Sequence, residues 1–151
     1  MRQLSRRATL VLGAGGAALT LLGWGGRAQA GVKEAAEQIA KFTGGKTATQ
    51  GKISIELPEI AENGNTVPLS IKVDSAMTAD DYVSEIRVVA DGNPNPGIVN
   101  FHLTPAAGRA EVATRIRLNS TENVIVLAKT STGKLYIDRK MVKVTVGGCG
   151  G

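Results

Sequence analysis

The sequence predicts an all-β protein, an immunoglobulin-like antiparallel β-sandwich of about seven strands. A short N-terminal helix and a flexible glycine-rich C-terminal arm are expected to flank it. From residue 52 onward, short runs carry apolar residues at every second position, as in VPLSIKVD at 67–74, which is the period of a half-buried strand. Stretches rich in Gly, Pro, Asn and Ser separate these runs about every ten to fifteen residues, a spacing typical of a sandwich.

The segment before the strands has helical spacing. Residues 32–42, VKEAAEQIAKF, place apolar side chains on one face with charged side chains between them. Gly44 and Gly45 follow, and glycine readily takes the left-handed conformation that ends a helix. We therefore expect one short helix over 32–42.

The strand pattern recurs in seven segments. They are 52–58, 67–74, 82–90, 98–103, 111–118, 123–131 and 134–146. The turns expected between them are 61–65, 91–97, 104–108, 119–123 and 132–133. The Cys-Trp-Cys core of antibody domains is absent from the sequence, so only the general architecture is implied. The last predicted strand runs to Val146 and passes directly into glycine.

Residues 1–30 have the organisation of an export signal. A basic start containing Arg6 and Arg7 precedes a glycine-diluted apolar stretch, and Ala28-Gln29-Ala30 forms an A-x-A cleavage signal. The paired arginines indicate the twin-arginine route, which exports folded proteins, although Thr9 and Val11 depart from its usual pattern. An uncleaved membrane anchor is the alternative, because an apolar run of about 18 residues can span a bilayer.

The leader sets the expected domain organisation and location. We expect cleavage near Ala30, a β-sandwich domain at 31–146 and an arm at 147–151. The product would lie in the periplasm without stable membrane insertion.

The basic character of the chain belongs mostly to the leader. The formal charge is +5, but residues 1–30 hold four arginines and no acid. Subtracting them from the 18 Lys and Arg leaves 14 against 13 Asp and Glu, a charge of about +1 for residues 31–151. No basic stripe and few aromatic residues remain, which argues against nucleic-acid binding.

The chain has one cysteine, Cys149, inside the terminal sequence GGCGG. No internal disulfide is possible, so in an oxidising compartment the thiol is free, bonded to another chain, or chemically occupied. Gly147, Gly148, Gly150 and Gly151 add no side chains and leave the backbone free to move. The three residues from Val146 to Cys149 reach about 10 Å when extended. The tail therefore predicts a thin arm with a single reactive atom near its tip.

The neighbours of Cys149 in the sequence do not activate it. A nucleophilic cysteine needs a histidine, a cation or a helix N-terminus to lower its pKa, and the glycines on either side supply none. This favours an attachment point over a catalytic residue, and we predict no catalytic residues in the chain. Two alternatives stay open: an intermolecular disulfide at Cys149 that tethers an exported binding or structural module, and a thiol enzyme activated by a group elsewhere. A C-terminus without function is a further possibility.

Other candidate sites are weak. His102 is the only histidine, whereas a typical zinc site needs three or four ligands, so a structural or surface role is expected. Asp80-Asp81 and the series Glu56, Glu59 and Glu62 lack the glycine placement of a calcium loop. We predict no metal site and no cofactor.

Several stretches together resemble the SoxY family, the sulfur-carrier subunits of bacterial thiosulfate oxidation. They are AENGNTVPL at 61–69, NPNPGIVNFHL at 93–103, ATRIRL at 113–118 and the terminal VTVGGCGG, combined with the twin-arginine leader. The resemblance covers essentially the whole chain. It implies that Cys149 is the covalent attachment site for thiosulfate-derived sulfur and that Gly147, Gly148, Gly150 and Gly151 form a swinging arm.

The resemblance also implies partners. A SoxZ-type β subunit would form a heterodimer with this chain. A c-type cytochrome complex would join thiosulfate to the thiol as a cysteine S-thiosulfonate, and a manganese-dependent sulfate thiohydrolase would release sulfate. A sulfur dehydrogenase, where present, would oxidise the remaining sulfane sulfur before a last hydrolysis frees the thiol.

Overall fold

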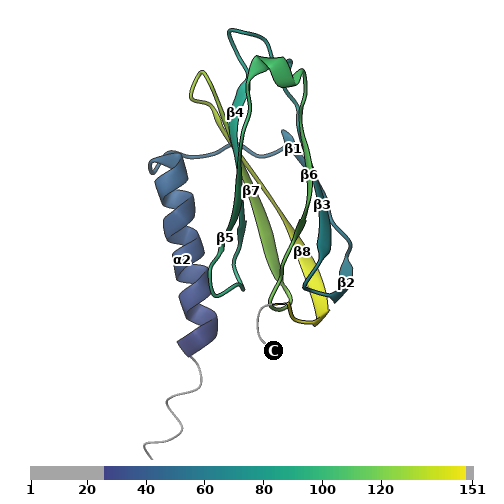
Figure 1. Cartoon of the computed structure of the whole chain (residues 1–151). Coiled ribbons are helices and arrows are strands. Elements are labelled where there is room, and N and C mark those ends of the chain that lie inside the picture. The colour runs from purple at the N-terminus through teal and green to yellow at the C-terminus, as the bar shows by residue number, and fades with distance from the viewer. Residues whose placement is uncertain (1–25, 149–151) are drawn as a thin grey trace, which may run out of the picture.

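The structure, a computed structural model, describes residues 26–148. It consists of one helix, α2, lying beside two β-sheets that pack face to face (Figure 1). Arg6 and Arg7 fall outside the described residues, as do Cys149, Gly150 and Gly151. The export signal, its cleavage and the tip of the arm therefore remain predictions.

Helix α2 spans Gly26–Thr43 and so includes the predicted helix at 32–42. It ends where the glycine pair predicts. Gly44 and Gly45 have φ of 61° and 76°, and the Gly45 amide donates to the Ala40 carbonyl oxygen at 3.2 Å, the longer bond of a Schellman cap. Within the described part of the chain, no helix combines the length and the hydropathy needed to cross a bilayer.

Within residues 26–148, eight strands build the sandwich. They are β1 (Ile53–Glu56), β2 (Ile60–Asn63), β3 (Val67–Val73), β4 (Val83–Ala90), β5 (Gly97–His102), β6 (Ala110–Ile116), β7 (Glu122–Thr130) and β8 (Leu135–Val146), with a 3₁₀ turn, η1, at Pro105–Ala107. One sheet has the order β1-β3-β6 and the other β2-β8-β7-β4-β5. The predicted sandwich is confirmed, and all seven predicted strands are present with ends shifted by at most two residues.

Strand β2 corrects two details of the prediction, because it raises the count to eight and pairs in parallel with β8. Ile60 lies opposite Lys143 and Asn63 opposite Val146 in this pairing, so the larger sheet is mixed. The sequence indicated a turn at 61–65 from the residues AENGN. Strand β2 has only four residues, of which only Ala61 is buried. A strand this short and this exposed carries no readable alternation.

The core lies between the two sheets. On β3, the alternating residues Val67, Leu69, Ile71 and Val73 are each at most 2% exposed, as their period of two requires. Strand β7 is instead apolar at every position of 124–128. Its even-numbered residues face the core between the sheets, and its odd-numbered residues face α2. Burial on both faces explains this continuous apolar run.

Helix α2 covers the outer face of the larger sheet (Figure 1). Ala35 and Phe42 pack against Val89, Ile125 and Leu127 in a second apolar cluster. The Arg87 guanidinium carbon lies 5.2 Å from the centre of the Phe42 ring, within the range of a cation–π contact. The helix therefore shields β4 and β7 from water.

The pairing gathers four chain segments at one end of the sandwich, which we call the arm end. They are 63–67, 90–97, 116–122 and 146–148. The pairs Asn63–Val146, Val67–Ile116 and Ala90–Val124 place them there. The described chain reaches its C-terminus at this end (Figure 1).

Candidate functional site

The arm leaves the domain through two glycines, Gly147 and Gly148, which we call the arm root. Three backbone hydrogen bonds connect this region. The Gly64 amide donates to the Val146 carbonyl oxygen at 2.7 Å, the Leu118 amide to the Gly64 carbonyl oxygen at 2.8 Å, and the Gly148 amide to the Leu118 carbonyl oxygen at 2.8 Å. Val146 at the end of β8 and Gly148 beyond it are thus each bonded to a turn of the domain.

The space around the arm root admits no side chain. A Cβ atom on Gly147 would clash with the Asn119 carbonyl oxygen, and one on Gly148 would clash with the Gly64 carbonyl group. A Cβ on Gly64 would in turn clash with the Leu118 carbonyl oxygen. None of these three glycines is among the described residues with positive φ. Close backbone approach is therefore the reason for glycine at these positions.

The predicted arm at 147–151 begins with two residues that contact the domain. Gly147 and Gly148 are seated against residues 64–65 and 118–119. Their lack of side chains serves packing against the domain. The boundary between domain and arm at residue 147 stays a prediction.

A buried carboxylate, Glu122, organises the turn next to the arm root. Glu122 is 4% exposed. Its Oε1 accepts from the Asn119 amide at 2.9 Å and from the Ser120 amide at 3.4 Å, and its Oε2 accepts from the Gly92 amide at 2.8 Å. One side chain therefore joins the turn after β4 to the turn before β7.

Asn93 supports the same turn from the opposite side. It is 6% exposed, and its Oδ1 accepts from the Asn119 amide at 2.8 Å while its Nδ2 donates to the Arg117 carbonyl oxygen at 2.9 Å. The Asn119 amide thus has two acceptors, one from each neighbouring segment. The backbone at 118–119 is fixed by side chains as well as by the strands.

The family of the chain follows from comparison with known proteins. The model of the family described as "Sulfur oxidation protein SoxY" matches residues 39–149, which is more than half of the chain. The match includes the arm root and ends on Cys149. The chain belongs to the SoxY family.

A solved SoxY structure agrees with this assignment. The sulfur carrier protein SoxY from Chlorobium limicola f thiosulfatophilum is 30% identical, with a TM-score of 0.62, over 76% of this chain and 98% of that one. Membership of the SoxY family connects the chain with sulfur oxidation. No match was found among curated proteins.

Superoxide reductases share the fold of this SoxY chain. The neelaredoxin of Ignicoccus hospitalis is 19% identical, with a TM-score of 0.55, over 62% of this chain and 80% of its own. The superoxide reductase of Nanoarchaeum equitans is 10% identical, with a TM-score of 0.53, over 64% and 100%. At these identities the likeness concerns the sandwich alone.

The two resolved glycines of the predicted arm lie at the arm end of this SoxY domain, but the other predicted candidates do not gather into a site. His102 is exposed on the edge strand β5. Across residues 26–148, no three His, Cys, Asp or Glu side chains lie close enough together to hold a metal ion. Glu56, Glu59 and Glu62 are exposed.

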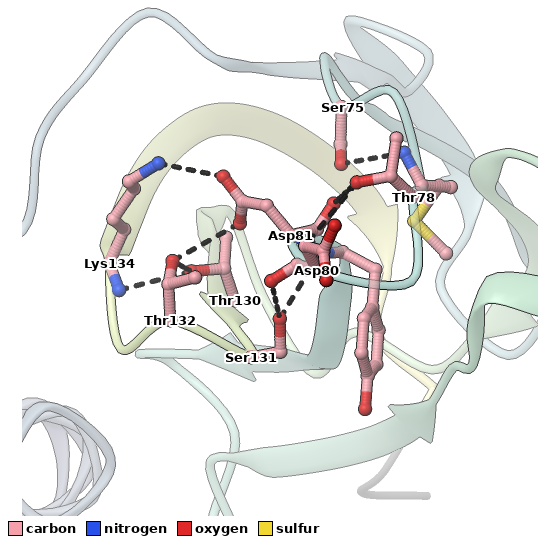
Figure 2. Close-up of polar contacts among 10 residues, drawn as sticks. Ser75, Thr78, Asp80, Asp81, Thr130, Ser131, Thr132 and Lys134 are labelled. Atoms are coloured by element: carbon pink, nitrogen blue, oxygen red, sulfur yellow. Dashed lines mark hydrogen bonds and ion pairs between the residues drawn. The ribbon is translucent and has the colours of Figure 1, made fainter.

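The opposite end of the SoxY sandwich holds a polar cluster around Asp81 (Figure 2). Asp81 accepts from Lys134 Nζ at 2.7 Å and from Thr132 Oγ1 at 3.1 Å, and its own amide donates to Thr78 Oγ1 at 3.1 Å. These bonds fasten the loop between β3 and β4 to the β7–β8 hairpin. The cluster is structural.

A depression of about 390 Å³ borders this cluster, and Lys52 and Lys134 contribute to its lining. Both lysines are paired, with Asp74 at 2.6 Å and Asp81 at 2.7 Å. Strand β8 has 12 residues, so the cluster lies roughly 35 Å from the arm root at about 3.3 Å per residue.

Burial raises the pKa of the Glu122 carboxyl, and the nearby Asp91 carboxylate adds to the rise, while the three amide donors oppose it. A group with a raised folded pKa stabilises the fold fully below its unfolded pKa, about 4.3 for Glu, and that stabilisation is lost as pH rises through the folded pKa. The difference in unfolding free energy between wild type and Glu122→Gln should therefore shrink from about pH 4 to about pH 7.

Urea titrations at both pH values measure this difference. Glu111→Gln is the matched control, because Glu111 forms an exposed ion pair with Lys72 at 3.2 Å. A difference that grows with pH for Glu122→Gln would contradict the prediction.

Sequence reasoning missed Gly64, Asn93 and Glu122 as parts of this site. All three lie in stretches assigned to turns at 61–65, 91–97 and 119–123. Two of these residues, Gly64 and Asn93, also lie within the segments 61–69 and 93–103 that resemble SoxY, which was a usable signal. The pairing of distant strands brings them together, and periodicity does not reveal such pairing.

Proposed function

We propose that the protein is a covalent carrier of sulfur intermediates in periplasmic thiosulfate oxidation, with Cys149 as the attachment site. The observation that carries this proposal is a family match to SoxY that extends to Cys149. The likeness to the sulfur carrier protein SoxY of Chlorobium limicola supports the carrier role. Strand β8 ends at one end of the sandwich (Figure 1), which supports the proposal that a thiol further along the chain is available to partner enzymes.

The attachment chemistry is an oxidative S–S bond formation. The Cys149 thiol loses its proton, its sulfur bonds to the sulfane sulfur of thiosulfate, and two electrons pass to a c-type cytochrome complex. The product is a cysteine S-thiosulfonate. Water then cleaves the bond to the terminal sulfone in a manganese-dependent thiohydrolase, which releases sulfate and leaves a persulfide on Cys149.

The remaining sulfane sulfur is oxidised while it is still bound. A sulfur dehydrogenase transfers three oxygen atoms from water to it and removes six electrons. Hydrolysis of the resulting cysteine S-sulfonate releases a second sulfate and restores the thiol. Cys149 is thus consumed and regenerated within one cycle.

The surroundings of the arm root support a carrier over an enzyme. Gly64, Asn65, Leu118 and Asn119 contact the arm root, and their side chains carry no ionisable group. These side chains offer no cation or histidine that would activate a thiol, so the thiol depends on its partner for activation. Each enzyme of the cycle supplies that activation in its own pocket.

The proposed partners follow from the family. A SoxZ-type β subunit forms a heterodimer with this chain, and the assembled pair leaves the cytoplasm by the twin-arginine route. The cytochrome complex, the thiohydrolase and the sulfur dehydrogenase then use the arm in turn.

Intact-mass analysis tests the proposal directly. Protein from cells grown on thiosulfate should carry sulfur adducts that map by peptide fragmentation to Cys149 and disappear after reduction. Protein from cells grown without reduced sulfur compounds is the control. A thiol that stays unmodified during thiosulfate oxidation, or a permanent disulfide to another chain, would refute the carrier function.

A further inference from the structure

We propose that the arm end contains a clamp, formed by Gly64, Leu118 and Asn119, that holds the arm root, and that Glu122 is its positioning residue. The clamp fixes the point at which Cys149 leaves the domain, and its opening lengthens the free arm. The inference rests on the proposed function in one respect, that Cys149 carries the substrate.

The decisive contact runs through a single peptide unit. The Leu118 carbonyl and the Asn119 amide belong to the same rigid plane. Its N–H donates to Glu122 Oε1 at 2.9 Å and to Asn93 Oδ1 at 2.8 Å. Its carbonyl oxygen accepts from the Gly148 amide at 2.8 Å. Because the plane does not bend, the side chains that hold its amide also aim its carbonyl at Gly148.

In its ionised form Glu122 makes stronger hydrogen bonds to the turns, although burial makes the ionisation itself costly to the fold. Hydrogen bonds to an ionised acceptor are stronger than neutral ones, and polarisation passes along a chain of such bonds. A buried carboxylate is costly unless its oxygens accept hydrogen bonds. Both oxygens of Glu122 accept hydrogen bonds from backbone amides, which belong to two turns. The carboxylate therefore orders the turns that form the clamp.

Packing makes the clamp selective for glycine. The Asn119 carbonyl oxygen occupies the space of a Cβ on Gly147, and the Gly64 carbonyl group occupies that of a Cβ on Gly148. A glycine that served only backbone flexibility would not need carbonyl groups packed into the space of its missing side chain. The first two glycines of GGCGG thus have a different role from Gly150 and Gly151.

The clamp sets the reach of the thiol. With the arm root held, the free arm starts at Cys149. Release of Gly147 and Gly148 adds two residues, or about 7 Å of extended chain.

Amide hydrogen exchange on the reduced protein, followed by NMR, tests the clamp without any sulfur chemistry. In the wild type, the Gly148 amide should exchange at least about tenfold more slowly than that of Gly150. Glu122→Gln places an NH₂ group against an amide donor, so it should bring the Gly148 rate to within about twofold of Gly150. Gly148→Ala should do the same at residue 148.

Two control variants should leave the Gly148 amide protected. Glu111→Gln makes the same chemical change at an exposed ion pair, and Gly150→Ala makes the same addition beyond the clamp. Protection of Val88 and Val126, both fully buried on central strands, reports whether each variant keeps the fold. If Glu122→Gln loses that protection too, Asn93→Ala tests the hold on the same peptide plane.

Several outcomes overturn the proposal. Equal exchange at Gly148 and Gly150 in the wild type means that no clamp exists. If the amide of residue 148 loses its protection in Gly148→Ala but keeps it fully in Glu122→Gln, Glu122 does not position the clamp. Failure of the carrier function appears separately, as a missing sulfur adduct on Cys149 in intact-mass analysis, and does not alter these rates.

Discussion

Replacing Cys149 with serine should abolish thiosulfate-dependent electron transfer in a reconstituted system with the partner enzymes. We expect a loss of about a hundredfold or more, down to the background rate, because a serine hydroxyl forms no S–S bond and is a weak nucleophile without an adjacent base. Cytochrome reduction with thiosulfate as the substrate measures the rate. Cys149 is the only cysteine in the chain, so no second thiol can replace it.

A relocated thiol provides the matched control for this experiment. Ser54→Cys in the Cys149→Ser background restores one cysteine per chain, on an exposed position of β1. It should not restore activity, because a thiol fixed on a strand cannot enter an enzyme channel. Full activity in Cys149→Ser would refute the attachment site, and rescue by the relocated thiol would refute the need for an arm.

The largest loss of stability is expected from truncation in the centre of the core. Ile86 on β4 is fully buried, and Ile86→Ala should lower the free energy of unfolding by about 2–5 kcal/mol. The loss combines the transfer energy of the missing methyl groups with the cavity that they leave. Urea denaturation followed by circular dichroism measures the change.

Ile60→Ala is the matched control for this second variant. Ile60 lies on β2 with 59% of its surface exposed, so the same truncation should change the stability by no more than about 0.5 kcal/mol. Similar shifts for both variants would mean that Ile60 is covered in solution or that Ile86 does not lie in a packed core.

The strands were predictable because the burial of each strand is visible in the sequence as a pattern of apolar and polar residues. The residues of β3 alternate between buried and exposed positions, and the glycine pair at 44–45 ends α2 with the conformations that glycine allows. These features depend on neighbours within a few positions. A window of local sequence therefore contains the information.

The pairing of the strands was not predictable in the same way. Strand β2 shows only one buried residue, and its parallel partner β8 lies about 80 residues further along the chain. Nothing in the local pattern distinguishes such a strand from a turn. The contact between Glu122 and Gly92 likewise joins segments 30 positions apart.

By itself, the sequence determined the sandwich class, the position of the lone thiol and the family to which the chain belongs. Only the tertiary structure showed what surrounds Gly147 and Gly148. A glycine in sequence signals a missing side chain, and that absence serves either motion or close contact. The difference lies in what occupies the vacant space, and here the Asn119 and Gly64 carbonyl groups fill it.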